Sequence, residues 1–375
     1  MPSAREYFNI AESFYNQGEY LRAEEIYSKA IELDPSNAFL YKCKGDCYKL
    51  IGFDLKDMGK FEEAIECFGM AINEFSISLK IDKNAFDAYS SRGTCYLTLR
   101  EIELALNDFN SMININKNDS NGYYLRAILF YEIEEYTNAL ADINMAIKLE
   151  PNNIGQYNKR IDIFEALGQT KNAINDCNNA LMLENNNSVL YFKRAQLYRK
   201  MNNIPQAIMD YSQAIIYTPN YFDAYVRRGD IYKKIGKNVE AINDYTMAIQ
   251  IDPTSPIVYV TRGISYFNIG EMDKALLDYS KAIEIDPNGS IVAYLNRSNV
   301  YRFKKEIDLA INDLKKAMEI APDFINSYFN LGSLYCENKD YQNAITYLSK
   351  VLEIDPESEL KNTVIQMINE CKQYV

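Results

Sequence analysis

The sequence predicts an all-α fold in which short helical hairpins stack one after another. Tyrosines recur every 34 residues along much of the chain, as at Tyr123, Tyr157 and Tyr191. Within each 34-residue segment, apolar and small residues fall on one helical stripe in each half. A short turn that often contains glycine separates the two halves. Each segment is therefore predicted to be a helix, a tight turn and a second helix.

Each segment also carries the same marked positions. The fourth residue is tyrosine, the eighth is usually small, the eleventh is aromatic and the thirty-second is mostly proline. The twentieth residue is an alanine in every segment: Ala23, Ala64, Ala105, Ala139, Ala173, Ala207, Ala241, Ala275, Ala310 and Ala344. Small residues let the two helices approach closely, and the aromatic rings fill the space around them.

This combination of period and marked positions resembles the tetratricopeptide repeat family over roughly residues 4–358. The resemblance implies an α-α superhelix, a right-handed solenoid of helix-turn-helix repeats. Ten repeats are expected near residues 4–37, 38–85, 86–119, 120–153, 154–187, 188–221, 222–255, 256–289, 291–324 and 325–358. Residues 359–375 are amphipathic and are expected to form a capping helix over the last repeat.

The second repeat is 14 residues longer than the others, because Tyr41 and Tyr89 lie 48 residues apart. Fourteen residues are two heptads, and the small and aromatic positions recur once more in each half. Each helix is therefore expected to gain seven residues, about two turns, which nearly preserves the packing phase. The projecting tip predicts a docking spur, with Leu50, Phe53, Leu55 and Phe61 as its candidate residues. The alternative is a longer hairpin that packs only on itself.

Arginine occupies the seventh position and aspartate the twenty-third in repeats three to nine, from Arg92 with Asp108 to Arg297 with Asp313. Both charges are missing from repeats one and ten. Because they disappear together, they are predicted to pair between the two helices of one repeat. The alternative is a row of arginines that binds a polyanion, but a structural ladder is the favoured interpretation.

The composition excludes several classes of function. The 375 residues carry a net charge of −12, which opposes binding to nucleic acid and to anionic membranes. The chain has no histidine, so it lacks the commonest general base and every histidine-containing metal site. No apolar run is long enough to span a membrane, and the first residues lack a signal core, so secretion is not expected.

The seven cysteines are odd in number and irregularly spaced, which predicts a reducing compartment and a cytoplasmic location. Four of them lie between Cys43 and Cys95, so a Cys₄ zinc site is an alternative. No CxxC knuckle is present, and they are predicted to be small buried packing residues. Neither a metal nor a cofactor is expected.

The family resemblance implies that the first helices line a concave groove, with the second, fifth, sixth, ninth, twelfth and thirteenth positions facing it. In repeats one to four this surface is aromatic and includes Tyr124 and Tyr131. In repeats five to seven it is basic, with Lys159, Lys193, Arg199, Lys200, Arg227, Lys233 and Lys234. A basic cluster on an acidic protein predicts binding of an acidic peptide or a terminal carboxylate. The alternative is a set of solvated lysines without a ligand.

The sequence therefore favours a non-catalytic scaffold or adaptor that binds a protein or peptide, rather than an enzyme. The alternative is a cochaperone-like or regulatory arm that acts with a separate enzyme subunit. The family's carboxylate clamp opens with a fifth-position lysine and a ninth-position asparagine. Here the fifth-position lysine, Lys42, is followed by Asp46 at the ninth position, so a standard clamp is not expected.

Overall fold

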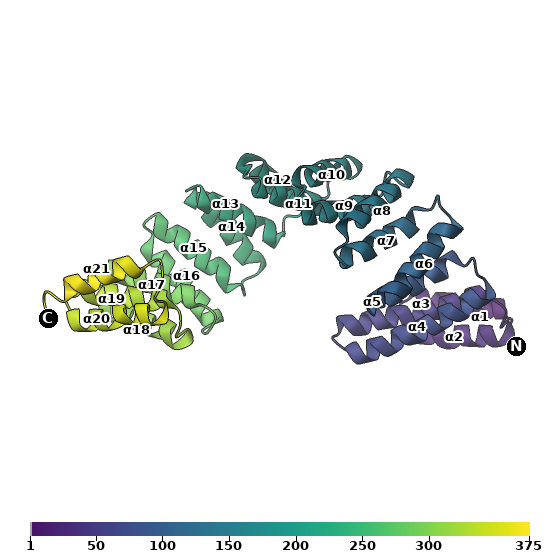
Figure 1. Cartoon of the computed structure of the whole chain (residues 1–375), viewed down its shortest axis with the longest axis horizontal. Helices are drawn as coiled ribbons and strands as arrows, with labels where there is room; N and C mark the ends of the chain where they lie inside the picture. The colour runs from purple at the N-terminus through teal and green to yellow at the C-terminus, as the bar shows by residue number, and fades with distance from the viewer. Residues whose placement is uncertain (1) are drawn as a thin grey trace. The chain divides into compact units, whose positions relative to one another are not determined.

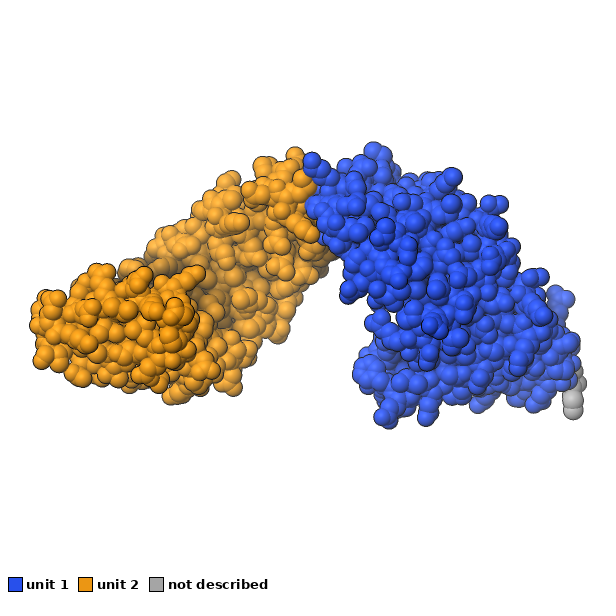
Figure 2. Space-filling model, viewed as in Figure 1, with its two compact units in different colours: residues 1–185 blue, residues 186–375 orange. Residues whose placement is uncertain are grey.

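The computed structural model describes residues 2–375, which form 21 α-helices and no strand (Figure 1). The predicted all-α solenoid of helix-turn-helix units is confirmed. The chain divides into two compact units, Met1–Asn185 and Asn186–Val375, which are coloured separately in Figure 2.

Unit 1 consists of five consecutive hairpins, each made of an odd-numbered helix and the even-numbered helix that follows it. Its helices are α1 (Ala4–Asn16), α2 (Tyr20–Leu33), α3 (Ala38–Asp57), α4 (Phe61–Ile81), α5 (Phe86–Thr98), α6 (Ile102–Ile115), α7 (Ser120–Glu132), α8 (Tyr136–Leu149), α9 (Ile154–Ala166) and α10 (Thr170–Leu183).

Unit 2 consists of five further hairpins and a final single helix that packs on the last of them. Its helices are α11 (Ser188–Lys200), α12 (Ile204–Tyr217), α13 (Phe222–Lys234), α14 (Asn238–Ile251), α15 (Pro256–Asn268), α16 (Met272–Ile285), α17 (Ile291–Phe303), α18 (Ile307–Ile320), α19 (Ile325–Glu337), α20 (Tyr341–Ile354) and α21 (Lys361–Cys371).

Close contact inside a hairpin depends on the small residue at the eighth position. A Cβ atom added to Gly263 would lie 2.6 Å from Cε1 of Tyr279, which is closer than real Cβ contacts come. The twenty-fourth residue therefore lies directly over the glycine and fills the space that a larger side chain would need. The same contact joins Gly45 to Phe75, Gly93 to Phe109, Gly229 to Tyr245 and Gly332 to Leu348.

The second hairpin is longer than its neighbours. Its helices α3 and α4 have 20 and 21 residues, whereas α5 and α6 have 13 and 14. The added turns repeat the glycine contact, because a Cβ on Gly52 would lie 2.8 Å from Cε1 of Phe68, just as one on Gly45 would lie 2.7 Å from Phe75. Repeating the same contact one heptad along each helix lets the longer pair stay in register.

The seven predicted arginine–aspartate pairs are confirmed. In the third hairpin, Nε and Nη2 of Arg92 donate to Oδ2 and Oδ1 of Asp108 at 2.9 and 2.7 Å. The same bidentate geometry joins Arg126 to Asp142, Arg160 to Asp176, Arg194 to Asp210, Arg228 to Asp244, Arg262 to Asp278 and Arg297 to Asp313. In the second hairpin Lys44 and Glu74 take their places, with Nζ 3.1 Å from Oε1.

These arginines also reach the preceding hairpin, which the sequence analysis did not predict. Nη1 of Arg92 donates to Oγ of Ser76 at 3.0 Å, and Nη1 of Arg126 donates to Oδ1 of Asn110 at 2.6 Å. The Arg92 guanidinium also lies 5.8 Å from the ring centres of Tyr89 and Tyr96. Each bond adds an intramolecular contact, so the arginines hold hairpins together, which supports the structural ladder over polyanion binding.

Candidate binding groove on the first helices

Several first helices of successive hairpins contact one another directly, as α5 contacts α7 in unit 1 and α13 contacts α15 in unit 2. Side chains expected to face the groove meet across these hairpin boundaries. Oγ of Ser91 on α5 donates to Oδ1 of Asp46 on α3 at 2.9 Å, and in unit 2 Nε of Arg302 on α17 donates to Oε2 of Glu337 on α19 at 2.7 Å. Within each unit, these positions therefore lie along a shared face.

In unit 1 this face is aromatic and carries one of the predicted cations. Tyr124 and Tyr131 on α7 are half-buried, and Nζ of Lys159 on α9 lies 4.5 Å from the centre of the Tyr131 ring. Tyr131 also makes an edge contact with Tyr136, with 5.6 Å between ring centres. Burial, and then the charge of Asp162, raise the pKa of both Tyr124 and Tyr131, so their hydroxyl groups remain proton donors. Three of the predicted groove residues thus lie on two adjacent first helices.

On α3, nearer the start of unit 1, the buried Asp46 binds Lys42, the lysine with which a carboxylate clamp would begin. Oδ2 of Asp46 lies 2.8 Å from Nζ of Lys42, and Oδ1 accepts a 2.8 Å hydrogen bond from Nζ of Lys49. Burial acts to raise the pKa of Asp46, but the two lysines outweigh it, so the pKa lies below its usual value. Lys42 is therefore held by an internal carboxylate.

In unit 2 the face is cationic. Six of the seven predicted basic residues lie on α11 and α13, whereas Lys159 belongs to unit 1. The exposed ones are Arg199, Lys200 and Lys234, and the half-buried ones are Lys193, Arg227 and Lys233. The predicted basic cluster therefore divides at the boundary between the units, and its larger part stands on two neighbouring helices.

Two tyrosine hydroxyls under this cationic face were not anticipated from the sequence. Tyr245 on α14 donates to Oδ1 of Asp230 at 2.8 Å, and Nη1 of Arg227 lies 3.8 Å from Oδ2 of the same carboxylate. Tyr211 on α12 is fully buried, and its hydroxyl has no hydrogen-bond partner among residues 2–375. The signal in the sequence is the ninth residue of each hairpin, which is Asp230 beside Tyr245 but Gln196 beside Tyr211.

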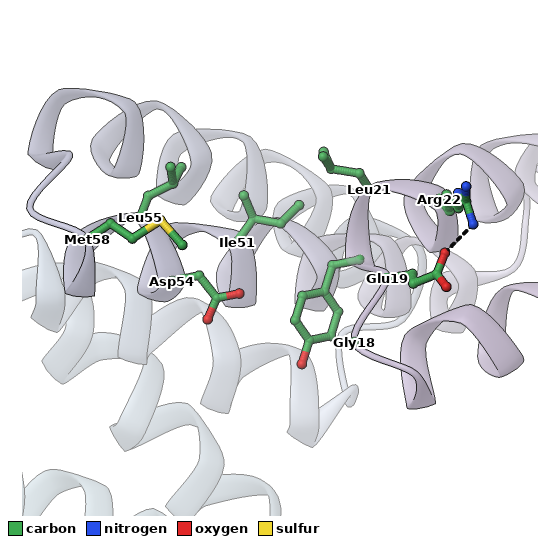
Figure 3. Close-up of a pocket in the computed structure, with 9 residues that line it drawn as sticks. Gly18, Glu19, Leu21, Arg22, Ile51, Asp54, Leu55 and Met58 are labelled. Carbon is green, nitrogen blue, oxygen red and sulfur yellow. Dashed lines mark hydrogen bonds and ion pairs between the residues drawn. The ribbon is translucent and has the colours of Figure 1, made fainter.

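The long second hairpin forms an apolar cleft with the first hairpin of unit 1 (Figure 3). Its volume is about 400 Å³, and its lining residues are Gly18, Glu19, Tyr20, Leu21, Arg22, Ile51, Asp54, Leu55 and Met58. Leu21 and Met58 are 68% and 71% exposed. Figure 3 shows Ile51 and Leu55 following one another along α3, with Met58 just beyond the end of the helix.

The four predicted spur residues have different surroundings. Leu55 lines the cleft, whereas the Phe53 ring packs edge-on against Phe68 at 5.1 Å. Phe61 begins α4 and is 62% exposed, and Leu50 is half-buried. Phe53 is half-buried because the second heptad of α4 supplies a partner ring, so part of the apolar surface of this hairpin packs on itself.

Three of the four cysteines within Cys43–Cys95 are buried packing residues, and the fourth, Cys67, is half-buried. Cys43, Cys47 and Cys95 are buried, and burial raises the pKa of each thiol to about 12. Over residues 2–375, no three His, Cys, Asp or Glu side chains are grouped so as to hold a metal ion. In the same part of the chain, no helix combines the length and the apolar character needed to cross a membrane.

Family models match the chain at six places. A model described as "Tetratricopeptide repeat" matches residues 4–37, 256–288 and 325–358, and one described as "TPR repeat" matches residues 195–236, 229–270 and 298–339. Together these matches cover about half of the chain. The chain belongs to the tetratricopeptide repeat family. Membership of this family supports a role in protein interaction.

Solved structures agree with this assignment of the fold. The C-terminal part of a TPR repeat-containing protein from Cytophaga hutchinsonii is 21% identical and superposes with a TM-score of 0.56 over 65% of this chain and 99% of that one. MamA is 27% identical over 44% of this chain and 95% of its own, with a TM-score of 0.42. Yeast Tom70 is 16% identical over 99% and 96%, with a TM-score of 0.44. The first of these supports the fold, and no curated protein matched the sequence.

Proposed function

We propose that this tetratricopeptide repeat protein is a non-catalytic scaffold that binds a protein or peptide segment on the face of its first helices. The observation that carries the proposal is the cationic face of α11 and α13, where Arg199, Lys200 and Lys234 stand exposed on a protein of net charge −12. Cations that oppose the overall charge favour an acidic segment as the ligand. The ten hairpins would then be ten repeats, with α21 closing the array.

Charge reversal tests this assignment. The triple variant R199E/K200E/K234E is expected to lose the native partner in a pulldown at moderate salt. The matched control is K281E/K316E/K350E, which reverses three lysines on the second helices α16, α18 and α20 of the same unit; Lys316 and Lys350 are exposed and Lys281 is half-buried. Loss of the partner in the first variant alone supports the proposal. Equal retention by both variants would remove the cationic face as the binding site.

The apolar cleft of the second hairpin is proposed as a further contact for the same partner. Leu21 and Met58 leave much of its rim exposed, and such surface is more often functional than isolated apolar residues. Deleting one heptad from each of α3 and α4 should preserve the fold, because the Gly45–Phe75 contact remains. Weaker partner binding by this variant is the expected result, and unchanged binding would remove the hairpin from the proposal.

The cochaperone-like alternative has less support from the side chains. Its carboxylate clamp requires a free lysine at the fifth position, and Lys42 is bound by Asp46 at 2.8 Å. We therefore assign the cationic face of unit 2, rather than a clamp in unit 1, as the peptide site. A cytoplasmic location is part of this proposal and is based on the odd number and irregular spacing of the cysteines.

A further inference from the structure

The hydroxyl group of Tyr211 differs from its counterparts in two other hairpins. Tyr27 in the first hairpin and Tyr245 in the seventh occupy the same twenty-fourth position, and each donates its hydroxyl proton to a carboxylate at the ninth position of the same hairpin. These carboxylates are Glu12 and Asp230. In the sixth hairpin the ninth residue is Gln196, and the Tyr211 hydroxyl has no partner among residues 2–375. The sixth hairpin therefore lacks the carboxylate that the other two supply.

An unpartnered buried hydroxyl is a costly feature, because folding removes it from water without a replacement hydrogen bond. Tyr211 is fully buried, with the Phe192 ring edge-on against it at 5.5 Å. The folded protein bears this cost for as long as the hydroxyl lacks a hydrogen-bond acceptor. A ligand atom that accepts the proton would remove this cost.

The charges of two arginines act on the same hydroxyl group. Arg199 follows Gln196 by one turn on α11, and Arg227 comes from α13 of the next hairpin. Burial raises the pKa of Tyr211 to about 12; the charges of Arg199 and Arg227 act to lower it and the smaller effect of the Asp230 charge acts to raise it, as expected if these groups lie nearby. Arg199 is exposed, and the contact between Nη1 of Arg227 and Oδ2 of Asp230 is long at 3.8 Å, so both guanidinium groups can turn toward an added anion.

We propose that the sixth hairpin binds a carboxylate of an acidic peptide, which takes the place of the missing ninth-position carboxylate. The ligand carboxylate would accept the Tyr211 hydroxyl proton, as Asp230 accepts that of Tyr245, and would pair with Arg199 and Arg227. The stacked rings of Phe192 and Tyr221, 5.0 Å apart, would lie beside the ligand backbone. Every side chain of this site belongs to unit 2.

This inference rests on the proposed function, and it adds the chemical group that is recognised and the residues that recognise it. It also makes an unusual prediction, because the chain can be given the missing group. The variant Gln196→Glu should place an internal carboxylate beside Tyr211, as Glu12 lies beside Tyr27. The internal carboxylate should stabilise the free protein and exclude the ligand carboxylate at the same time.

The test measures binding of fluorescein-labelled hexaglutamate by fluorescence anisotropy, with hexaglutamine as the neutral probe. Gln196→Glu is expected to weaken binding about tenfold and to raise Tm by about 2–4 °C. The matched control Gln213→Glu makes the same chemical change on α12, two residues beyond Tyr211. It should leave the affinity within about twofold of the wild type, because it adds charge without reaching the hydroxyl.

A second variant removes the hydroxyl group alone. Tyr211→Phe should weaken hexaglutamate binding about tenfold without lowering Tm, because its hydroxyl makes no bond that the free protein would lose. Tyr245→Phe, which loses the bond to Asp230, should lower Tm. These opposite effects separate a ligand-binding hydroxyl from a structural one.

Three results would overturn the inference: equal binding of hexaglutamate and hexaglutamine, equal affinity of Gln196→Glu and Gln213→Glu, or wild-type affinity of Tyr211→Phe. The proposed function fails separately, if R199E/K200E/K234E retains the native partner as well as its control does. Loss of the partner on charge reversal together with unchanged binding by Tyr211→Phe would therefore reject this site and leave the scaffold function standing.

Discussion

The ion pair between Arg194 and Asp210 offers the most quantitative test of the packing described above. Nε and Nη2 of the arginine donate to the two carboxylate oxygens at 2.7 Å each, and the side chains are 16% and 1% exposed. Changing Asp210 to Ala removes two charge-assisted hydrogen bonds and leaves the guanidinium group largely buried. The free energy of unfolding should fall by about 3–5 kcal/mol, and Arg194→Ala should cost a similar amount.

The double variant distinguishes a pair from two independent residues. Once one partner is absent, removing the other relieves a buried charge, so the double change should cost about 3–4 kcal/mol rather than the sum of the two. Urea unfolding followed by circular dichroism measures all four proteins. A matched cycle combines Asp210→Ala with Arg199→Ala, which removes an exposed arginine on α11, the helix that carries Arg194. The effects of these two changes on the free energy of unfolding should be additive. Additivity of the Arg194 cycle to within about 0.5 kcal/mol would refute the ladder.

Three further predictions follow from the packing and the thiols. Gly263→Ala should lower the free energy of unfolding by about 1–3 kcal/mol in urea melts, because the added Cβ would lie 2.6 Å from Cε1 of the buried Tyr279 ring. Gly69→Ala, with no neighbour within 4 Å, should not lower it. Burial raises the pKa of the Cys47 thiol from 9.0 to about 12, so the unfolded chain releases this proton at lower pH than the folded one. The free energy of unfolding should therefore fall as the pH rises from about 9 to 12. A Cys47→Ala variant whose free energy of unfolding falls with the same slope would contradict this. Oxidation by diamide should join Cys336 to Cys371 in a disulfide, because their Sγ atoms lie 2.9 Å apart. Mass spectrometry should detect the mass loss of two hydrogens on the linked peptides, and a different cross-linked pair would contradict the geometry.

Much of the fold could be predicted because the chain contains its own comparison. Ten similar segments show which positions vary together, and the joint loss of arginine and aspartate in the first and last segments located the ion pairs without an alignment of relatives. The third bond of arginines such as Arg92 and Arg126 was missed. A small polar residue at the twenty-fifth position, such as Ser76 or Asn110, accepts it, but only the stacking geometry shows that this position faces the next hairpin.

The candidate site was less predictable, because position in a repeat indicates which way a side chain points and not which neighbour it meets. Lys159 was assigned to the basic cluster, yet its ammonium group lies over the Tyr131 ring in unit 1. Phe53 was assigned to a docking spur, and the structure shows that it is half-buried with its ring against Phe68. The unpartnered Tyr211 hydroxyl was missed because Gln196 at the ninth position is informative only once the structure shows that Tyr245 donates to the ninth-position carboxylate of its own hairpin.

The central claim is that the cationic face of α11 and α13 binds an acidic segment of a protein partner. Its most direct test is a photo-cross-linking amino acid placed at position 234 on α13, compared with position 281 on α16, in extracts of the native cell with and without excess hexaglutamate. The account predicts a protein adduct at position 234 that hexaglutamate displaces, and no such adduct at position 281. An adduct of equal yield at both positions, or one that hexaglutamate leaves unchanged, would contradict it.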